Sequence, residues 1–201
     1  MCGRVYMAPA DPELREFIKE MNRSKLAARF RKDENDLFQP DGEVFPTAVM
    51  PALASSRSGQ LRVFPMKWGF RERKLLLINA RAETAADKTI FRDSWSCHRC
   101  AIPASWYYEW EHDAKSKTGQ KYALRPATGG LVWFAALYRM ENDIPVFVIL
   151  TRPADDNIHW IHDRMPVMLP KEEIRKWIFE GFTPGEILGK SLKEISWQQV
   201  V

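Results

Sequence analysis

Residues 131–137 read LVWFAAL, and residues 145–150 read PVFVIL. Both runs have the length and the apolar composition of buried strands, and the Gly129-Gly130 pair before the first is typical of a turn. Shorter runs of the same kind recur through the chain. We predict further strands at 47–53, 61–66, 75–78, 99–102, 106–110, 121–125 and 196–201.

Helical patterns are fewer. Asp11-Pro12-Glu13 is typical of a helix start, and apolar residues then recur at helical spacing. We predict helices from residue 12 to 21, with an interruption at 22–24 and a continuation at 25–30, and at 82–88, 154–161, 171–180 and 183–190, with a surface loop at 31–46. Many short strands and few helices predict an α+β fold around a curled antiparallel sheet. No linker is visible, so we expect a single domain over residues 1–201.

Composition sets broad limits on function. The chain has 201 residues, of which 45% are hydrophobic, with eight tryptophans and eleven phenylalanines, and a net charge of +4. This charge permits an anionic partner without requiring one. Three cysteines give no disulfide framework, and no apolar run approaches eighteen residues. Without a membrane span or a secretory signal, we expect a cytoplasmic protein.

The chain begins Met1-Cys2-Gly3-Arg4. Removal of Met1 by an aminopeptidase would give Cys2 a free α-amine beside its thiol. The amine can form a Schiff base with an aldehyde, and the thiol can then close a thiazolidine ring on the same carbon. Gly3 permits close approach of a ligand, and Arg4 adds a permanent cation. The alternative is that Cys2 merely follows the start codon.

Three inner stretches place polar groups among apolar neighbours. Asn79 and Arg81 follow an apolar strand. Glu109 lies among aromatic residues, which should raise its pKa and suit it to general acid–base chemistry. His162 is followed by Asp163 and Arg164, which can hold one tautomer. Each also has an ordinary structural interpretation: Glu109 can face solvent, and His162 can be a helix-end histidine.

Cys97-His98-Arg99-Cys100 has the spacing of half a zinc site. A tetrahedral site needs a second pair of ligands, and the sequence offers none that is evident. We therefore expect no bound metal and no cofactor.

Five motifs occur in a fixed order: MCGR at 1–4, WG at 68–69, INARAET at 78–84, SWYYEW at 105–110 and IHDRMPV at 161–167. As a set they resemble the SRAP family, the SOS-response-associated proteins that crosslink to abasic sites in DNA. The resemblance extends from residue 1 to about residue 180. It implies an α+β fold with a β-barrel-like core, flanking helices and a basic groove for single-stranded DNA.

The resemblance also implies residue roles. Cys2 would form the thiazolidine with the ring-opened abasic sugar, Asn79 would orient the reacting groups, and Glu109 and His162 would transfer protons. Arg4 and Arg81 match arginines that hold phosphates, while Trp68 and Trp106 lie in motif positions near the DNA channel. The implied protein is a self-crosslinking enzyme with lyase- or peptidase-like chemistry, monomeric, and associated with the nucleoid when bound to single-stranded DNA that contains abasic sites.

The chain departs from the family pattern in two places. Gly42-Glu43-Val44-Phe45 replaces a Tyr-Asn pair that many members carry before the proline at position 46. After Trp68-Gly69, the short basic segment 70–74 replaces a loop that bears proline and tryptophan. We hypothesise that charge replaces some base stacking in this region.

Three other functions remain open on the sequence. Cys2 could serve a peptidase-like activity, with the release of Met1 as its minimal form. Amidotransferases with an N-terminal nucleophile also begin Met-Cys-Gly, but the glutamine-binding arginine motif that they need is not evident here. A non-catalytic DNA-binding module would bind intact and abasic strands equally.

Overall fold

The computed structural model describes residues 2–8, 10–31, 33, 38, 40–111 and 119–200. Its strands are β1 (Val5–Met7), β2 (Gly42–Val44), β3 (Val49–Ser55), β4 (Leu61–Trp68), β5 (Phe70–Glu72), β6 (Leu75–Leu77), β7 (Asn79–Arg81), β8 (Arg99–Ala104), β9 (Trp106–Trp110), β10 (Lys121–Pro126), β11 (Val132–Glu141), β12 (Ile144–Pro153), β13 (Arg164–Pro166) and β14 (Ile195–Gln199). Its helices are α1 (Pro12–Arg23), the 3-10 helix η1 (Lys25–Arg29), α2 (Ala82–Ala85), α3 (Thr89–Cys97), α4 (Lys171–Phe179) and α5 (Pro184–Lys190).

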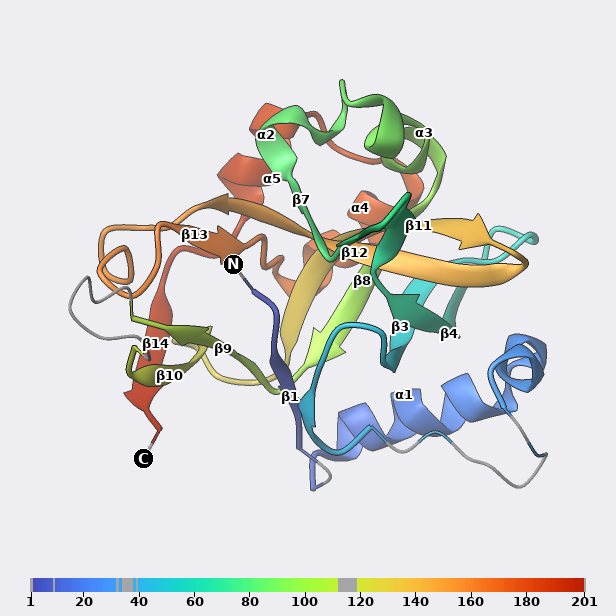
Figure 1. The fold of residues 1–201 in the computed structure, drawn as a ribbon, viewed down its shortest axis with the longest axis horizontal. Coiled ribbons are helices and arrows are strands. Elements are labelled where there is room, and N and C mark those ends of the chain that lie inside the picture. The colour runs from blue at the N-terminus through green and yellow to red at the C-terminus, as the bar shows by residue number, and fades with distance from the viewer. Residues whose placement is uncertain are drawn as a thin grey trace.

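Five strands close into a barrel. They are hydrogen-bonded in the order β11-β8-β3-β4-β12, and the pairing of β12 with β11 completes the ring (Figure 1). This confirms the expected α+β class with a barrel-like core. The barrel is not wholly antiparallel, however, because β12 runs parallel to β4. A parallel pair needs a long crossover, and residues 69–143 provide it.

The far end of β12 gathers two short strands. β7 pairs in parallel with one edge of β12 through Ile149, Leu150 and Thr151. β13 pairs with β12 in the antiparallel sense, from Thr151 to Pro153. Two of the five sequence motifs, which are about eighty residues apart, are therefore held on the same strand.

A second sheet lies against the barrel, with strand order β14-β10-β9-β1-β2. All of its pairings are antiparallel. β1 lies between β9 and β2, because Val5 pairs with both Tyr107 and Val44. This arrangement places the N-terminal motif beside the SWYYEW motif.

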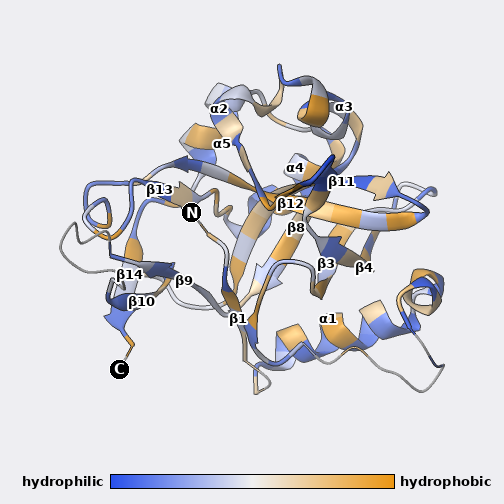
Figure 2. Cartoon of the chain, viewed as in Figure 1, coloured by the Kyte–Doolittle hydropathy of each residue, from blue (hydrophilic) through white to orange (hydrophobic). Residues whose placement is uncertain are grey.

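The barrel strands are buried on both faces. Along β11 and β12, alternate residues belong to two different apolar clusters: Phe134 and Phe147 to one, Trp133 and Val148 to the other. The first cluster includes Cys2 and Tyr107, and the second includes the buried apolar residues of α2, α3, α4 and α5. Figure 2 shows the resulting concentration of hydrophobic residues along β8 and β12 and the alternation of hydrophobic and hydrophilic residues along α1.

Most predicted helices are confirmed, but two predictions fail. α1 begins as expected, with Asp11 accepting a hydrogen bond from the Leu14 amide at 3.0 Å. Helix α3 was not predicted, although Phe91, Ser94 and Trp95 have helical spacing and are buried. Residues 154–161 form successive turns instead of a helix. The chain must return from β12 to the adjacent β13 within this segment, and the Ala154 amide bonds to the Asp163 carbonyl at 2.9 Å, which leaves room only for turns.

The predicted loop at 31–46 contains β2, and it lies partly outside the described residues. Of the helices in the described part of the chain, none has the length and apolar composition needed to span a membrane.

Candidate active site

Cys2 is fully buried and lies three residues before β1. The Asn79 side chain, on β7, donates a hydrogen bond from Nδ2 to the Cys2 carbonyl oxygen at 2.9 Å. Asn79 is held in place because its neighbour in the ladder is Ile149 of the barrel. The barrel thus fixes the position of the N-terminal backbone through one side-chain amide. Met1 lies outside the described residues.

Glu109 lies on β9 and is 5% exposed. Burial raises the pKa of its carboxyl group to about 7, and the negative charge of Asp163 acts in the same direction. Burial also raises the pKa of the Cys2 thiol, and the charge of Glu109 raises it further. The two groups are therefore within electrostatic reach of each other. A thiol in this setting is neutral, so a reaction through sulfur needs a nearby proton acceptor.

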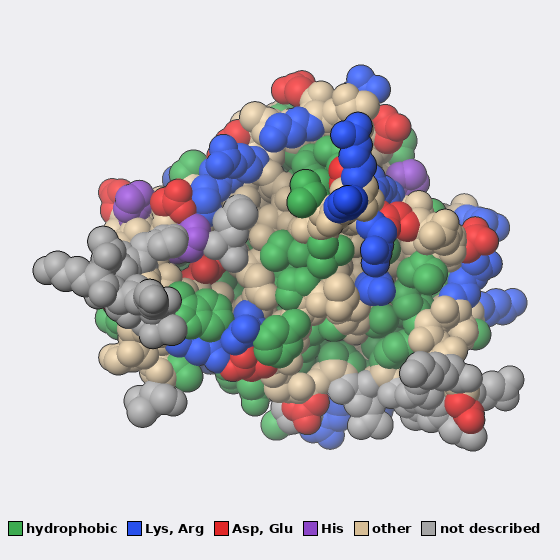
Figure 3. Space-filling model, viewed as in Figure 1, with side chains coloured by type: hydrophobic (Ala, Val, Ile, Leu, Met, Phe, Trp, Pro, Cys, Tyr) green, Lys and Arg blue, Asp and Glu red, His purple; other side chains and the backbone are tan. Residues whose placement is uncertain are grey.

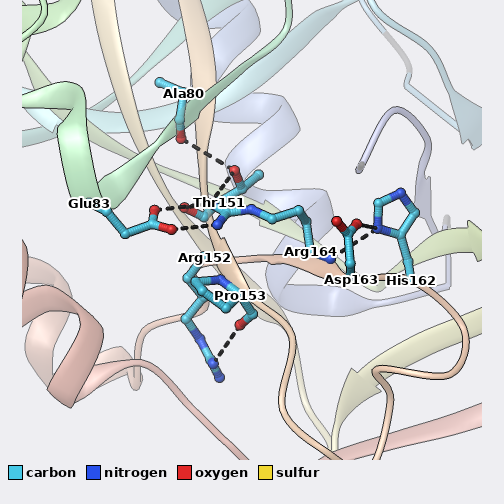
Figure 4. A network of polar contacts seen from close by, with 8 residues as sticks. All are labelled: Ala80, Glu83, Thr151, Arg152, Pro153, His162, Asp163 and Arg164. Carbon is cyan, nitrogen blue, oxygen red and sulfur yellow. Dashed lines mark hydrogen bonds and ion pairs between the residues drawn. The ribbon is translucent and has the colours of Figure 1, made fainter.

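His162 follows the turns after β12, with 13% of its side chain exposed. Its Nδ1 atom accepts a hydrogen bond from the Arg164 amide at 2.9 Å and lies 2.8 Å from Asp163 Oδ1 (Figure 4). The neutral ring can accept from Arg164, whereas a protonated ring can donate to Asp163. His162 thus has a partner in both protonation states, as a proton-transfer group requires.

Arg164 anchors this turn to the barrel. It forms an ion pair with both carboxylate oxygens of Glu83, and its Nη2 atom donates to the Thr151 carbonyl at 2.9 Å (Figure 4). Burial opposes ionisation of Glu83, but the hydrogen bonds from Arg164 hold its pKa below the ordinary value. Glu83 lies in the INARAET motif and Arg164 in the IHDRMPV motif, but no local pattern predicts that they pair.

The Arg4 side chain contacts residues of β2 and β9, the two strands that flank β1. Its guanidinium donates to Glu43 at 3.3 Å and lies 4.3 Å from the centre of the Phe45 ring and 4.8 Å from that of Trp110. Glu43 also forms an ion pair with Lys121. Arg81 is exposed and, within the described part of the chain, forms no ion pair.

The two predicted tryptophans have different environments. Trp68 is fully buried, stacks near Phe147, and donates its indole N–H to the Ile78 carbonyl at 3.0 Å. The resemblance places Trp68 near the DNA channel. We correct that expectation, because the side chain supports the backbone next to Asn79 and has no exposed face. Trp106 is partly exposed and stacks on Tyr6 with ring centres 4.1 Å apart.

Comparison with known proteins identifies the group to which this site belongs. The family model described as SOS response associated peptidase (SRAP) matches residues 1–200. The chain is a member of the SRAP family. It is 32% identical to the abasic site processing protein YedK of Escherichia coli, over 98% of this chain and 85% of that protein. It is 34% identical to the abasic site processing protein YobE of Bacillus subtilis, over 71% of this chain and 73% of that protein.

Solved structures support the same fold. An X-ray structure of a protein from Bacteroides thetaiotaomicron matches with a TM-score of 0.75 at 20% identity, covering all of this chain and 92% of that one. A phage-related protein from Bordetella bronchiseptica matches with a TM-score of 0.71 at 22% identity, covering 99% of this chain and 94% of that one.

The two departures from the SRAP pattern now have a structural description. Glu43 supplies a carboxylate between the cations of Arg4 and Lys121. Residues 70–77 form the β5–β6 hairpin, which carries three exposed cations, Arg71, Arg73 and Lys74. The hairpin ends at Leu77, two residues before Asn79, so its cations are close in sequence to a residue of the site.

Three further residues of this SRAP site were not predicted from the sequence. Trp110 and Phe45 flank Arg4, and Tyr107 is buried where the charges of Cys2 and Glu109 raise its pKa further than burial alone. The alternation of side chains along a strand predicts that Trp110 faces away from its neighbour Glu109. No local pattern distinguished Phe45.

Proposed function

We propose that this SRAP protein binds single-stranded DNA that contains an abasic site and links itself covalently to the sugar through Cys2 after Met1 is removed. The proposal is supported by the family membership, by relatives named for abasic site processing, and by the meeting of Cys2, Asn79 and Glu109 in one buried site. The observation that carries it is the Asn79–Cys2 hydrogen bond beside a carboxyl group whose pKa is about 7.

The chemistry follows from these groups. The Cys2 amine attacks the aldehyde carbon of the ring-opened sugar to give a carbinolamine. The carbinolamine loses water to give an imine, and protonated Glu109 is suited to supply the proton that the departing hydroxyl takes. The thiol then adds to the imine carbon, and its proton passes to the imine nitrogen. The thiazolidine and one water molecule are the products.

His162 fits the earlier step. An abasic sugar exists mostly as a closed hemiacetal, so a proton must leave the hydroxyl while the ring oxygen is protonated. The Nδ1 atom of His162 has the Arg164 amide as a donor and the Asp163 carboxylate as an acceptor. The ring can therefore gain or lose a proton and keep its orientation. Asn79 holds the Cys2 backbone still during both steps.

DNA binding would use the cations around the site. Arg4 and Arg81 would contact phosphates on either side of the lesion, and Trp110 and Phe45 offer aromatic faces next to Arg4. Cytoplasmic DNA transiently exposed as a single strand is the substrate that we infer.

The decisive experiment incubates the protein with an oligonucleotide that carries one abasic site and resolves the mixture on a denaturing gel. We expect a heat-stable adduct with wild type and none with Cys2→Ala or with an intact oligonucleotide. An absence of adduct with wild-type protein whose Met1 has been removed would refute the proposal.

A second activity is suggested by the family description, which contains the word peptidase. The same Cys2 and Glu109 could release Met1 from the chain itself. Intact mass of protein made in cells without methionine aminopeptidase tests this, because retention of Met1 there would exclude self-cleavage.

A further inference from the structure

The second sheet has two chemically different faces. Alternation along β9 places Tyr107 and Glu109 toward the Cys2 site and Trp106, Tyr108 and Trp110 on the other side. On this outer face Tyr108 lies opposite Ala123 of β10, and Ala123 lies opposite Gln198 of β14. The small side chain of Ala123 leaves a hollow between larger neighbours.

The hollow has a volume of about 260 Å³. It is lined by Trp106, Ala123, Arg125, Ser196, Trp197 and Gln198. Tyr6 covers one face of the Trp106 indole, with ring centres 4.1 Å apart and planes inclined by 4°. Trp106 lines the hollow and Tyr6 does not, so the part of the indole that borders the hollow is not covered by Tyr6. We call this hollow the Trp106 slot.

The side chains of the Trp106 slot suit a flat, polar ring on a negatively charged backbone. Trp106 contributes an aromatic ring to the lining, Ala123 contributes only a methyl group, and Gln198 is exposed. Arg125 is exposed, and within the described residues its guanidinium forms no ion pair. Stacking against an aromatic ring next to a free cation is how proteins hold single-stranded nucleic acid without reading its sequence.

We propose that the Trp106 slot binds a base of the strand that flanks the abasic site, with Arg125 on the adjoining phosphate. The proposal rests on the proposed function, since it assumes that single-stranded DNA occupies the Cys2 site. It adds a second point of attachment, so the preferred substrate is a strand long enough to reach from the lesion to the slot.

Contacts across the outer face connect the slot to Arg4, one of the two arginines proposed to hold DNA. Tyr108 meets the Trp106 ring edge-on, with centres 6.5 Å apart, and the Lys121 ammonium lies 3.9 Å from the centre of Tyr108. Lys121 reaches Glu43, which reaches Arg4. Figure 3 shows hydrophobic, basic and acidic side chains side by side over the ends of β1 and β9. A strand crossing this face would meet aromatic rings and cations in alternation.

The test measures binding against strand length. Fluorescence anisotropy would follow oligonucleotides with a central tetrahydrofuran, an abasic analogue that cannot form the adduct, extended one nucleotide at a time on the 5′ or the 3′ side. For wild type we expect one step of roughly tenfold tighter binding, on one side only, when the strand becomes long enough to reach the slot. Trp106→Ala should remove that step, and Ala123→Leu should remove it by filling the hollow.

Phe179→Ala is the matched control, because it also removes a partly exposed aromatic ring, and Phe179 lies on α4, outside the slot. It should keep the step. A smooth length series for wild type, or a step that survives in both slot variants, would overturn the proposal and would favour a protein segment as the occupant. Adduct formation by wild type with a natural abasic strand is measured separately. If the slot does not bind a base, the adduct still forms but the binding step is absent; if the proposed function is wrong, no adduct forms.

Discussion

The side-chain amide of Asn79 lies 2.9 Å from the carbonyl oxygen of Cys2, and this contact joins the barrel to the N-terminal strand. Asn79 is fixed by β12, whereas Cys2 precedes a strand of only three residues. The hydrogen bond therefore limits how far the reactive residue can move from Glu109.

Asn79→Ala should slow adduct formation by about tenfold, because a lost hydrogen bond of this kind is worth roughly 1 kcal/mol or slightly more. Single-turnover gel assays at saturating DNA measure the rate. Asn157→Ala is a matched control, since Asn157 also donates its side-chain amide to a backbone carbonyl, that of Ile195, at 3.1 Å. Equal rates for the two variants would contradict an orienting role for Asn79.

The rate should depend on pH through Glu109. Its pKa of about 7 means that the protonated carboxyl group, which is suited to assist loss of water, disappears as the pH rises above 7. We expect the logarithm of the adduct-formation rate to change slope near pH 7 in wild type and to show no such change in Glu109→Gln, which should also be slower. An identical bend in the variant would assign the titration to another group.

The free energy of unfolding should also depend on pH through the Glu109 carboxyl group. Between its ordinary pKa of 4.5 and about 7, folded Glu109 keeps a proton that the unfolded chain has released. The folded state binds more protons in this window, so wild type loses stability as the pH rises through it, by on the order of 2–3 kcal/mol. Urea unfolding of wild type and Glu109→Gln from pH 5 to pH 8 should show the two free energies of unfolding diverging, with the variant favoured at high pH. Glu16→Gln, at an exposed helical site, should run parallel to wild type.

Glu43→Gln should strengthen binding to single-stranded DNA. Glu43 neutralises both Arg4 and Lys121, so its removal frees two cations for phosphates. We expect several-fold tighter binding and a steeper dependence on salt, by about 0.7 in the log–log slope for each phosphate gained. Glu173→Gln, which breaks a comparable ion pair with Lys190 on α5, controls for the change in net charge. Weaker binding by Glu43→Gln would instead indicate that the carboxylate contacts DNA directly.

Replacement of Arg71, Arg73 and Lys74 by alanine should flatten the salt dependence of DNA binding. All three are exposed on the β5–β6 hairpin, which precedes Asn79. The slope should fall by up to about 2, since each phosphate contact on a single strand contributes about 0.7. The control is a triple alanine variant at Lys88, which directly precedes α3, at Arg92 on α3 and at Arg175 on α4. It removes the same charge and should keep the wild-type slope.

The sequence by itself determined the strand-rich α+β class, most element positions and the SRAP membership, because these depend on local periodicity, turn residues and short motifs. It also indicated the raised pKa of Glu109, since aromatic neighbours on both sides of one residue imply burial. Only the tertiary structure decided which polar groups meet. The parallel pairing of β7 with β12 brings Asn79 to Cys2, and the Arg164–Glu83 ion pair holds the His162 turn.

The two predictions that were wrong, for residues 154–161 and for Trp68, failed because tertiary contacts override the local pattern. Residues 154–161 have a helical pattern, but the chain must turn back at once to pair β13 with β12. Trp68 lies in a motif, yet barrel closure buries it completely. Local chemistry depends on the side chains of a segment, whereas contacts between residues some eighty positions apart depend on how the strands pair, and no short stretch of sequence specifies that.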